Sequence, residues 1–306
     1  MSIPTSRDKE PANVFIDIEK CNGCGLCVEV CKDFTFSIDD HKVVKSDKPV
    51  FGCVACGHCM MICPTGVIAI EGRTLSPVEL FHLPDKSTVP TYESLLAMLQ
   101  HRRSIREFKD IPVEYDKINK ILEAAQTAPM GIPPSDVHVL VLENKKQVHD
   151  FAVEFSTFLK SVRWMASNWF MALMRPFWGK ANDEMMHSFM KPVFNVYIDS
   201  MEKGENWINY DAPLAMYFYG SPYSDPADPI VAATYAMIAG EALGLGTCML
   251  GGIHPFIQYG KKARLFREKY GIKYPSREGL FVIFGYSDVK YKRGVKRTFA
   301  DIHRIR

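Results

Sequence analysis

From residue 91 to its end, the chain alternates between segments of helical and of strand-like hydrophobic periodicity. Apolar residues recur at helix spacing over 91–108, where Thr91 can cap the first turn, and again over 114–128. Three continuous apolar runs predict buried strands: 137–143, 212–220 and 279–287. A fourth apolar segment, 229–246, predicts a core helix that stops at a glycine. The mixture of helix and strand predicts an α+β domain, within which 151–209 is helical but has no clean polar face.

The front of the chain follows another pattern, an internal repeat. The run "CNGCGLCVEVC" at 21–31 is echoed by "CVACGHCMMICP" at 53–64, and short β-like runs such as "GVIAI" flank the copies. Two copies predict a module with pseudo-twofold symmetry. The next stretch is rich in proline and scattered charge, which is typical of an extended connector. We therefore predict three parts: a first domain at 1–75, a linker at 76–90 and a second domain at 91–306.

Composition fits a folded protein and argues against two classes of partner. Apolar residues make up 47% of the chain and charged residues 24%, and the formal net charge is +2. A protein that coats nucleic acid or an anionic membrane carries a strong basic excess, so we expect neither partner. The longest uncharged run, 242–260, contains several glycines and a His-Pro pair, which predicts a buried segment. The polar start has no apolar leader, which predicts a cytoplasmic protein with reduced thiols.

The cysteines carry the most specific chemical signal in the chain. Eight of the nine fall between Cys21 and Cys63, in two runs with gaps of two, two and three residues. This spacing is typical of bacterial two-cluster ferredoxins, in which the fourth cysteine of each run binds the cluster of the other run. The predicted ligands of one 4Fe-4S cluster are Cys21, Cys24, Cys27 and Cys63. The predicted ligands of the second cluster are Cys53, Cys56, Cys59 and Cys31.

Other uses of these cysteines fit less well. A pair of zinc sites would use paired C-x2-C units, but zinc sites rarely place three cysteines at gaps of two and two. A disulfide framework is disfavoured in a reducing compartment. The first run ends in Cys-Lys instead of the Cys-Pro of the ferredoxin pattern, so Lys32 affects the local turn and the nearby potential while the number of ligands stays the same.

Several features of the second domain suit a phosphate and a flat ligand. Arg102, Arg103 and Ser104 offer two guanidinium groups and a hydroxyl in succession, although a solvated basic face has the same sequence. Near the end, "KYKRGVKRTF" gathers Lys292, Arg293, Lys296 and Arg297, which again suits a phosphate or a soluble tail. The stretch "GLGTCMLGG" lacks the third glycine of a dinucleotide fingerprint and follows a helix, so a Rossmann site is disfavoured.

Together, these residues and their order resemble the flavin-dependent nitroreductase family over residues 91–306. With the front module, the chain is similar to a ferredoxin and nitroreductase fusion. The resemblance implies flavin mononucleotide (FMN), with its phosphate on Arg102, Arg103, Ser104, Lys296 and Arg297. It places Leu250, Gly251 and Gly252 against the flavin ring. It also implies an interlocked homodimer, in which one subunit covers the partner's flavin with Pro129, Met130, Gly131, Ile132 and Pro133.

One departure from the family pattern affects the flavin environment. Where the family commonly has Ser and Asn followed by Gln-Pro-Trp, this chain has Met130, Pro133 and "SDV". Fewer side-chain amides would then contact the ring, so the flavin potential or the choice of substrate would differ. Cys248 is expected to be a small packed residue.

The expected function is ferredoxin-linked, FMN-dependent reduction of a nitroaromatic, a quinone or an activated alkene. An external low-potential donor such as ferredoxin would supply electrons. Two alternatives stay open: a non-catalytic carrier or redox sensor, and a flavin reductase driven by a nicotinamide cofactor. No side chain is an evident general acid or base. The aromatic and methionine residues of 164–178 predict core or dimer packing, or an adaptable lid that favours a flat, apolar substrate.

Overall fold

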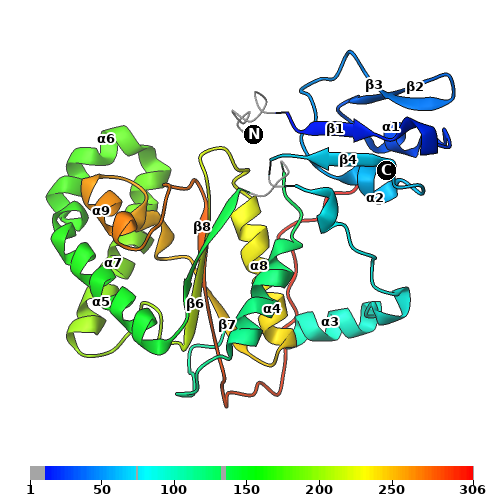
Figure 1. Cartoon of the computed structure of the whole chain (residues 1–306). Helices are drawn as coiled ribbons and strands as arrows, with labels where there is room; N and C mark the ends of the chain where they lie inside the picture. Colours follow the sequence, from blue (N-terminus) through cyan, green and yellow to red (C-terminus); the bar gives the residue numbers. More distant parts are fainter. Residues whose placement is uncertain (1–10, 74, 132–135, 306) are drawn as a thin grey trace.

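The computed structural model describes residues 11–73, 75–131 and 136–305, which form a small module and a larger sheet domain (Figure 1). The small module contains two antiparallel strand pairs. The first pair joins β1 (Asn13–Ile16) to β4 (Ile68–Glu71), and the second joins β2 (Phe36–Asp39) to β3 (Lys42–Lys45). Two short helices, α1 (Leu26–Val30) and α2 (His58–Ile62), contact each other.

The two halves of the small module repeat the same local geometry, as the sequence repeat predicts. Each helix has five residues, and each follows a glycine in the left-handed region, with φ of 75° at Gly25 and 74° at Gly57. Glycine adopts this conformation without steric cost, so the chain can turn sharply between the second and third cysteine of each run. The module's own core includes Val43, Ile70 and three of the cysteines: Cys21, Cys27 and Cys59.

The segment that joins the module to the sheet domain has little regular structure. It contains two 3-10 turns, Pro77–Glu79 and Lys86–Thr88, and residues 78–95 are all exposed. Helix α3 (Tyr92–His101) follows, and the Thr91 hydroxyl accepts a hydrogen bond from the Ser94 amide, 3.3 Å away, as expected of a cap.

The predicted helix at 91–108 is wrong beyond His101. Ser104 forms a parallel bridge with Thr247, and the Ile105 amide donates a hydrogen bond of 2.9 Å to the Thr247 carbonyl. Pairing with the edge of the sheet thus provides backbone hydrogen bonds in place of those that a longer helix would have formed.

The large domain is built on a four-stranded sheet in the order β5-β6-β8-β7, with every neighbouring pair antiparallel. Three strands confirm the predicted runs: β5 (Val137–Leu142), β6 (Leu214–Gly220) and β8 (Gly279–Gly285). The edge strand β7 (Gly246–Leu250) was not predicted, because it is short and lies in a glycine-rich stretch directly after a helix. Every residue of β6 and β8 is buried, so helices must cover both faces of the sheet.

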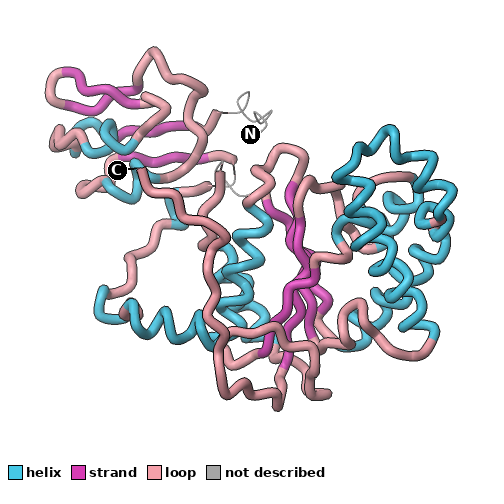
Figure 2. Tube along the Cα trace, turned by 180° about the vertical axis from the view of Figure 1, so that it is seen from behind, coloured by secondary structure: helices cyan, strands magenta, loops and turns pink. Residues whose placement is uncertain are grey.

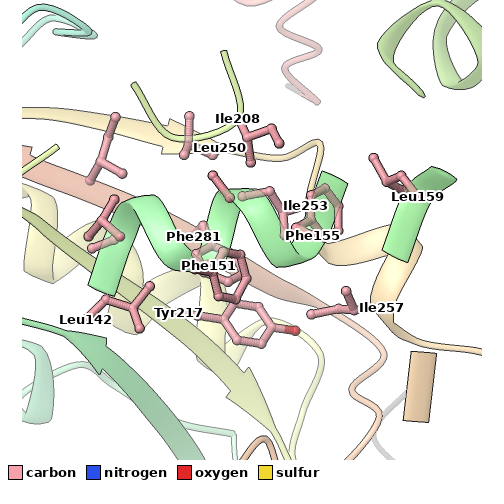
Figure 3. Close-up of a cluster of buried hydrophobic side chains, with 14 of the residues drawn as sticks. Leu142, Phe151, Phe155, Leu159, Ile208, Tyr217, Leu250, Ile253, Ile257 and Phe281 are labelled. Atoms are coloured by element: carbon pink, nitrogen blue, oxygen red, sulfur yellow. The ribbon is translucent and has the colours of Figure 1, made fainter. Parts of the chain in front are cut away.

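Two helical layers cover the sheet (Figure 2). Helices α4 (Tyr115–Gln126) and α8 (Asp228–Ala242) pack on one face. On the other face lie α5 (Lys145–Ser161), α7 (Lys191–Glu202) and α9 (Lys261–Lys269). Figure 3 shows this second core, in which Phe151 and Phe155 of α5 lie over Tyr217 and Phe281. The rings of Tyr217 and Phe281 stack with centroids 4.3 Å apart.

A buried polar network crosses the second core. The Tyr217 hydroxyl lies 2.9 Å from Nδ1 of His254, and the Gln258 side chain lies 3.1 Å from the same nitrogen. Burial lowers the pKa of His254, so the imidazole is held neutral and can share these hydrogen bonds. Arg267 donates to the Ile257 and Gln258 carbonyls, which satisfies its buried guanidinium group.

Residues 163–190 form a helical excursion at the outer end of the α5 and α7 layer. A 3-10 turn (Arg163–Ala166) leads into α6 (Asn168–Met185), which contains Pro176 and changes direction at Gly179, where φ is 74° and ψ is 167°. A π-helical turn (Met186–Met190) joins α6 to α7. Several large apolar side chains here are exposed: Trp164, Met165, Trp169, Leu173, Phe177, Met185 and Phe189. In the part of the chain that the structure describes, no helix is both long and apolar enough to span a bilayer.

Candidate functional site

The structure groups three thiols of the first predicted cluster site. Cys27 is buried at the start of α1, and its pKa is raised first by burial and then by the nearby thiols of Cys63 and Cys24. Cys63 comes from the other run, so the fold brings the fourth cysteine across, as the ferredoxin pattern requires. The sulfur of Cys21, the remaining member, faces the backbone amides of Gly23 at 3.4 Å and Val43 at 3.5 Å.

The second predicted site gathers in the same way at the start of α2. Burial, and after it the neighbouring thiols of Cys53, Cys56 and Cys31, together raise the pKa of Cys59 to about 12. Burial raises the pKa of Cys53 as well, and its neighbours include Cys56 and Cys31. Cys31 belongs to the first run. Seven of the eight cysteines thus fall into the same two groups as in the predicted ligand assignment, which stays a prediction.

The local environment of these thiols fits bound iron. Burial and mutual repulsion oppose the ionisation of neighbouring thiols, whereas a bound cation stabilises thiolates. Backbone amides also approach the sulfurs: despite burial, hydrogen bonds from Val67, Thr65 and Gly66 lower the pKa of Cys63. Among the described residues, no group of three or more His, Cys, Asp or Glu side chains is arranged to hold a single metal ion.

The predicted phosphate residues lie where α3 ends and the chain joins the edge of the sheet. Arg102 ends the helix, and Ser104 pairs with Thr247 of β7. Arg103 and Ile105 line one cavity beside β7, and alternation along an extended chain predicts that Arg102, Ser104 and Arg106 face the other side. The Arg102 guanidinium has a buried Nη1 with no hydrogen-bond partner among the described residues. A buried cationic donor without a partner is costly, so this nitrogen is free to donate a hydrogen bond to an anion.

The basic residues near the C-terminus meet Arg103 instead of Arg102. A cavity of about 510 Å³ is lined by the last turns of α3, by Arg103 and by residues 291–296, including Lys296. The Arg103 guanidinium donates to the carbonyls of Gln100, 2.5 Å away, and of its neighbour Arg102, 2.7 Å away. Arg297 is exposed and does not line this cavity. The structure therefore brings Arg103 and Lys296 together, and it leaves Arg297 outside.

The predicted ring-facing glycines follow β7 and approach α7. An added Cβ at Gly251 would meet no atom within 4 Å, whereas one at Gly252 would lie 2.4 Å from the hydroxyl oxygen of Tyr197. Leu250 is buried in the core on the α5 and α7 face of the sheet. Gly251 thus presents open backbone that a flat ligand can approach closely.

The predicted ring-covering segment lies on the opposite face. Ala128 packs in the α4 and α8 core, and Pro129 and Met130 line a cavity of about 290 Å³ beside α4 and α8. The Gly131 amide donates a hydrogen bond of 2.8 Å to the Asp228 carboxylate. Burial raises the pKa of Asp228. Ile132 and Pro133 lie outside the described residues. Within one chain, the described part of this segment and Leu250 thus lie on different faces of the sheet.

Sequence reasoning missed three residues near the glycines. The Arg106 guanidinium carbon lies 5.8 Å from the centre of the Tyr210 ring. Tyr210 has a left-handed backbone, with φ of 56°, which is strained for a tyrosine and typical of functional sites. Burial, and after it the nearby Tyr210 hydroxyl, raises the pKa of Tyr197 to about 12. Of the three, only Arg106 could have been found from the sequence, because it lies two residues after the predicted phosphate residue Ser104.

A sheet domain joined to a module of paired cysteine runs defines a two-part redox protein, and comparisons with known proteins agree. The nitroreductase family model matches residues 99–286. A model of 4Fe-4S dicluster domains matches residues 20–67. The chain belongs to the nitroreductase family, and it is a fusion of that domain with a dicluster ferredoxin domain. Its class is therefore oxidoreductase, as predicted.

Individual relatives each resemble one part of the chain. An uncharacterized ferredoxin of Methanocaldococcus jannaschii is 38% identical over 60 residues, which are 19% of this chain and 94% of that protein. A probable oxidoreductase of Bacillus subtilis is 31% identical over 80 residues, which are 22% of this chain but only 8% of that protein. A nitroreductase with bound FMN from Bacteroides fragilis has a TM-score of 0.50 at 17% identity, over 69% of this chain and 98% of that one. This last likeness shows the fold of the sheet domain.

The two glycines after β7 give a matched pair of substitutions. We expect Gly252→Ala to lower the free energy of unfolding by roughly 1 to 3 kcal/mol, because the new methyl group overlaps the Tyr197 hydroxyl. Gly251→Ala should change it by less than about 0.5 kcal/mol, because it points into open space. Urea unfolding followed by circular dichroism measures both. The double variant Gly252→Ala/Tyr197→Phe should recover part of the loss, and equal stability of the two single variants would contradict the contact.

Proposed function

We propose that this protein is an FMN-dependent oxidoreductase that takes electrons through two 4Fe-4S clusters to reduce a nitroaromatic, a quinone or an activated alkene. When bound, flavin accepts two electrons and transfers them as hydride, and each cluster passes one electron at a time. The family membership supports the reaction class, and the paired cysteine sets support the electron supply. The FMN bound by the Bacteroides fragilis structure supports the choice of flavin.

The observation that carries the flavin proposal is the buried, unpartnered Nη1 of Arg102. A phosphate on this side of the chain would accept hydrogen bonds from Arg102 and from the Ser104 hydroxyl, whose backbone is fixed by its bridge to Thr247. From Thr247 the strand runs directly to Gly251, so one extended segment connects the phosphate residues with the open backbone that would face the ring. Arg106 lies two residues after Ser104 and faces the Tyr210 ring, so both side chains are candidates to contact the cofactor.

The two adjacent arginines provide a matched test of the phosphate assignment. Arg102→Ala should weaken FMN binding by roughly tenfold or more, because a charge-assisted hydrogen bond from a buried donor contributes about 1.5 to 3 kcal/mol. Arg103→Ala should weaken it less, because the Arg103 guanidinium already donates to backbone carbonyls. Titration of flavin-depleted protein with FMN, and with riboflavin as the ligand without phosphate, measures the difference. An equal loss for riboflavin would refute a phosphate role for Arg102.

The arrangement of the front module indicates which of the two predicted cluster sites would pass electrons to the sheet domain. Gly57, which follows Cys56, lies against Leu75, where the chain leaves the module. A Cβ atom added to Gly57 would be 3.5 Å from the Leu75 side chain. The other run lies against the β2–β3 hairpin, because the Cys21 sulfur meets the Val43 amide. Figure 1 shows β2 and β3 at the far side of the module and α2 on the side toward the sheet domain. The set of Cys53, Cys56 and Cys59 is thus the one nearest to the linker.

Cluster variants test the electron path. We expect Cys24→Ala and Cys56→Ala to slow reduction of the bound flavin by dithionite-reduced ferredoxin at least tenfold, because each removes a ligand from one cluster. Stopped-flow absorbance of the flavin gives the rate, and iron and sulfide analysis gives the cluster content. The matched control is Cys248→Ala, which removes the buried cysteine outside both runs. Unchanged rates in variants that lack a cluster would refute the path. Rapid reduction by NADH in the same variants would favour a nicotinamide donor.

Turnover assays separate an enzyme from a carrier. With reduced viologen as donor, an enzyme converts at least one of a nitroaromatic, a quinone and an enone, whereas a carrier converts none of them while its flavin is still reduced. The identity of the product also distinguishes nitro reduction from alkene reduction, which the same ring face can support.

We also propose that the active form is a homodimer. In the described chain, α3 contains no buried residue, and large apolar side chains stay exposed on the connector, on α3 and on the final segment, among them Phe81, Leu83, Tyr92, Val295 and Phe299. Such an extended apolar surface is typical of an interface. The described ring-covering residues and Leu250 lie on opposite faces of the sheet, which supports a site completed by the partner.

Light scattering after size exclusion tests the dimer. We expect a mass near twice 34.7 kDa for the unmodified protein. Phe81→Asp/Leu83→Asp should shift the mass toward one chain and release FMN, because a charge on an apolar interface is costly to bury. Val153→Asp is the control, an exposed position on α5. A monomeric protein that keeps its flavin would contradict the proposal.

A further inference from the structure

A second, apolar cavity lies among α5, α7 and the turn that follows β7. Its volume is about 420 Å³, within the range of small-molecule sites. We call it the α5–α7 pocket and define it by six lining side chains: Phe158, Val162, Met186, Met190, Phe194 and Phe256. None of the residues predicted to bind FMN lines it.

The wall of the pocket suits the apolar body of a ligand. The rings of Phe194 and Phe256 meet edge to face with centroids 5.5 Å apart and form an aromatic part of the wall. Met186 and Met190 form part of the wall, and methionine side chains adapt to irregular shapes. Trp164 and Tyr259 also line the pocket, and both are largely exposed, so they stand at its mouth.

The charged residues of the pocket are all of one sign. Lys191, Lys261 and Lys262 line it, and no acidic residue does. The Lys191 ammonium group donates to the Asn168 side chain, and that of Lys262 donates to the Ser161 carbonyl, 2.6 Å away. Lys261 is exposed and has neither an ion pair nor a side-chain hydrogen bond with any described residue. Three lysines beside an apolar cavity with no countercharge create a positive potential at its mouth.

The pocket is separated from the candidate flavin residues by a layer of rings. Phe155 meets Phe256 on the pocket side and Tyr197 on the other side, each with centroids 6.2 Å apart. The Tyr197 hydroxyl lies against Gly252. A ligand in the pocket would therefore lie behind this layer, on the side away from Gly252.

We propose that the α5–α7 pocket binds an amphipathic organic acid, with its apolar body between Phe194, Phe256 and the methionines and its acid group at Lys261. The charge of the lysines, without any acidic residue, selects an anion over a neutral or cationic ligand. The concave shape and its volume favour one small molecule. An aromatic acid and a short acyl acid share this chemistry, and separate probes distinguish them.

Calorimetric titration of the holoprotein under anaerobic conditions tests the site with three probes: 1-naphthoate, dodecanoate and the uncharged 1-naphthalenemethanol. We expect one site per chain, with naphthoate or dodecanoate bound more tightly than the alcohol. Lys261→Gln should weaken binding of the acids roughly two- to fivefold, the size expected of an exposed charge contact, and leave the alcohol unchanged. Lys203→Gln, an exposed lysine outside the pocket, is the control and should alter none of the three.

A variant that fills the cavity completes the test. Val162→Trp should abolish binding of all three probes while the thermal midpoint shows that the protein is folded, and Met190→Trp is the second choice if Val162→Trp unfolds. Unaltered binding in a folded, filled variant would overturn the proposal. So would binding of several probe molecules per chain, or binding to phosphatidylglycerol vesicles that Val162→Trp does not reduce, because these results would identify a lipid-binding surface in place of a pocket.

Discussion

The front module depends on the electrostatics of crowded thiols. Cys27, Cys53 and Cys59 are each partly or fully buried next to other cysteines, and in each case burial is the first cause of a raised pKa. These thiols therefore ionise poorly by themselves, and bound iron would stabilise their thiolate form. The left-handed glycines, the short helices and the crossing of Cys31 and Cys63 between runs all hold sulfur atoms in place for that metal. Metal binding and folding of this module should be one equilibrium.

The sheet domain depends on a different constraint, which is the burial of its central strands behind a rigid, extended edge. Strands β6 and β8 are completely buried between two helical layers, and β7 lies on their edge. The chain after α3 adds itself to that edge through Ser104 and Thr247. Two segments about 140 residues apart in sequence thereby become neighbours. The end of α3 and the bridge at Ser104 thereby fix the backbone on both sides of Arg102.

The sequence predicted those parts of the fold that local patterns control. Cysteine spacing identified the ferredoxin module, and apolar runs located β5, β6 and β8, because both signals lie within short windows. The prediction was wrong at 102–108, where helical spacing continued but long-range pairing with β7 prevailed, and it missed β7 itself. Tyr197 and Tyr210 could not be found from the sequence, because only the packing of α7 and the strained turn before β6 bring them to Gly252 and Arg106. The two arginines were predicted as equivalent, and only the three-dimensional structure separates their partners.

The exposed connector has a consequence for how the two domains cooperate. Residues 78–95 contribute no side chain that is buried within their own chain, so within one subunit the connector links the ferredoxin module to the sheet domain as a tether, even where Phe81 and Leu83 would meet a partner subunit. A tether of this length keeps its two ends at an effective concentration on the order of millimolar, whatever the dilution of the protein. Encounters between the modules would then be frequent and independent of protein concentration, and the brief contact needed for electron transfer would not require a stable docked interface.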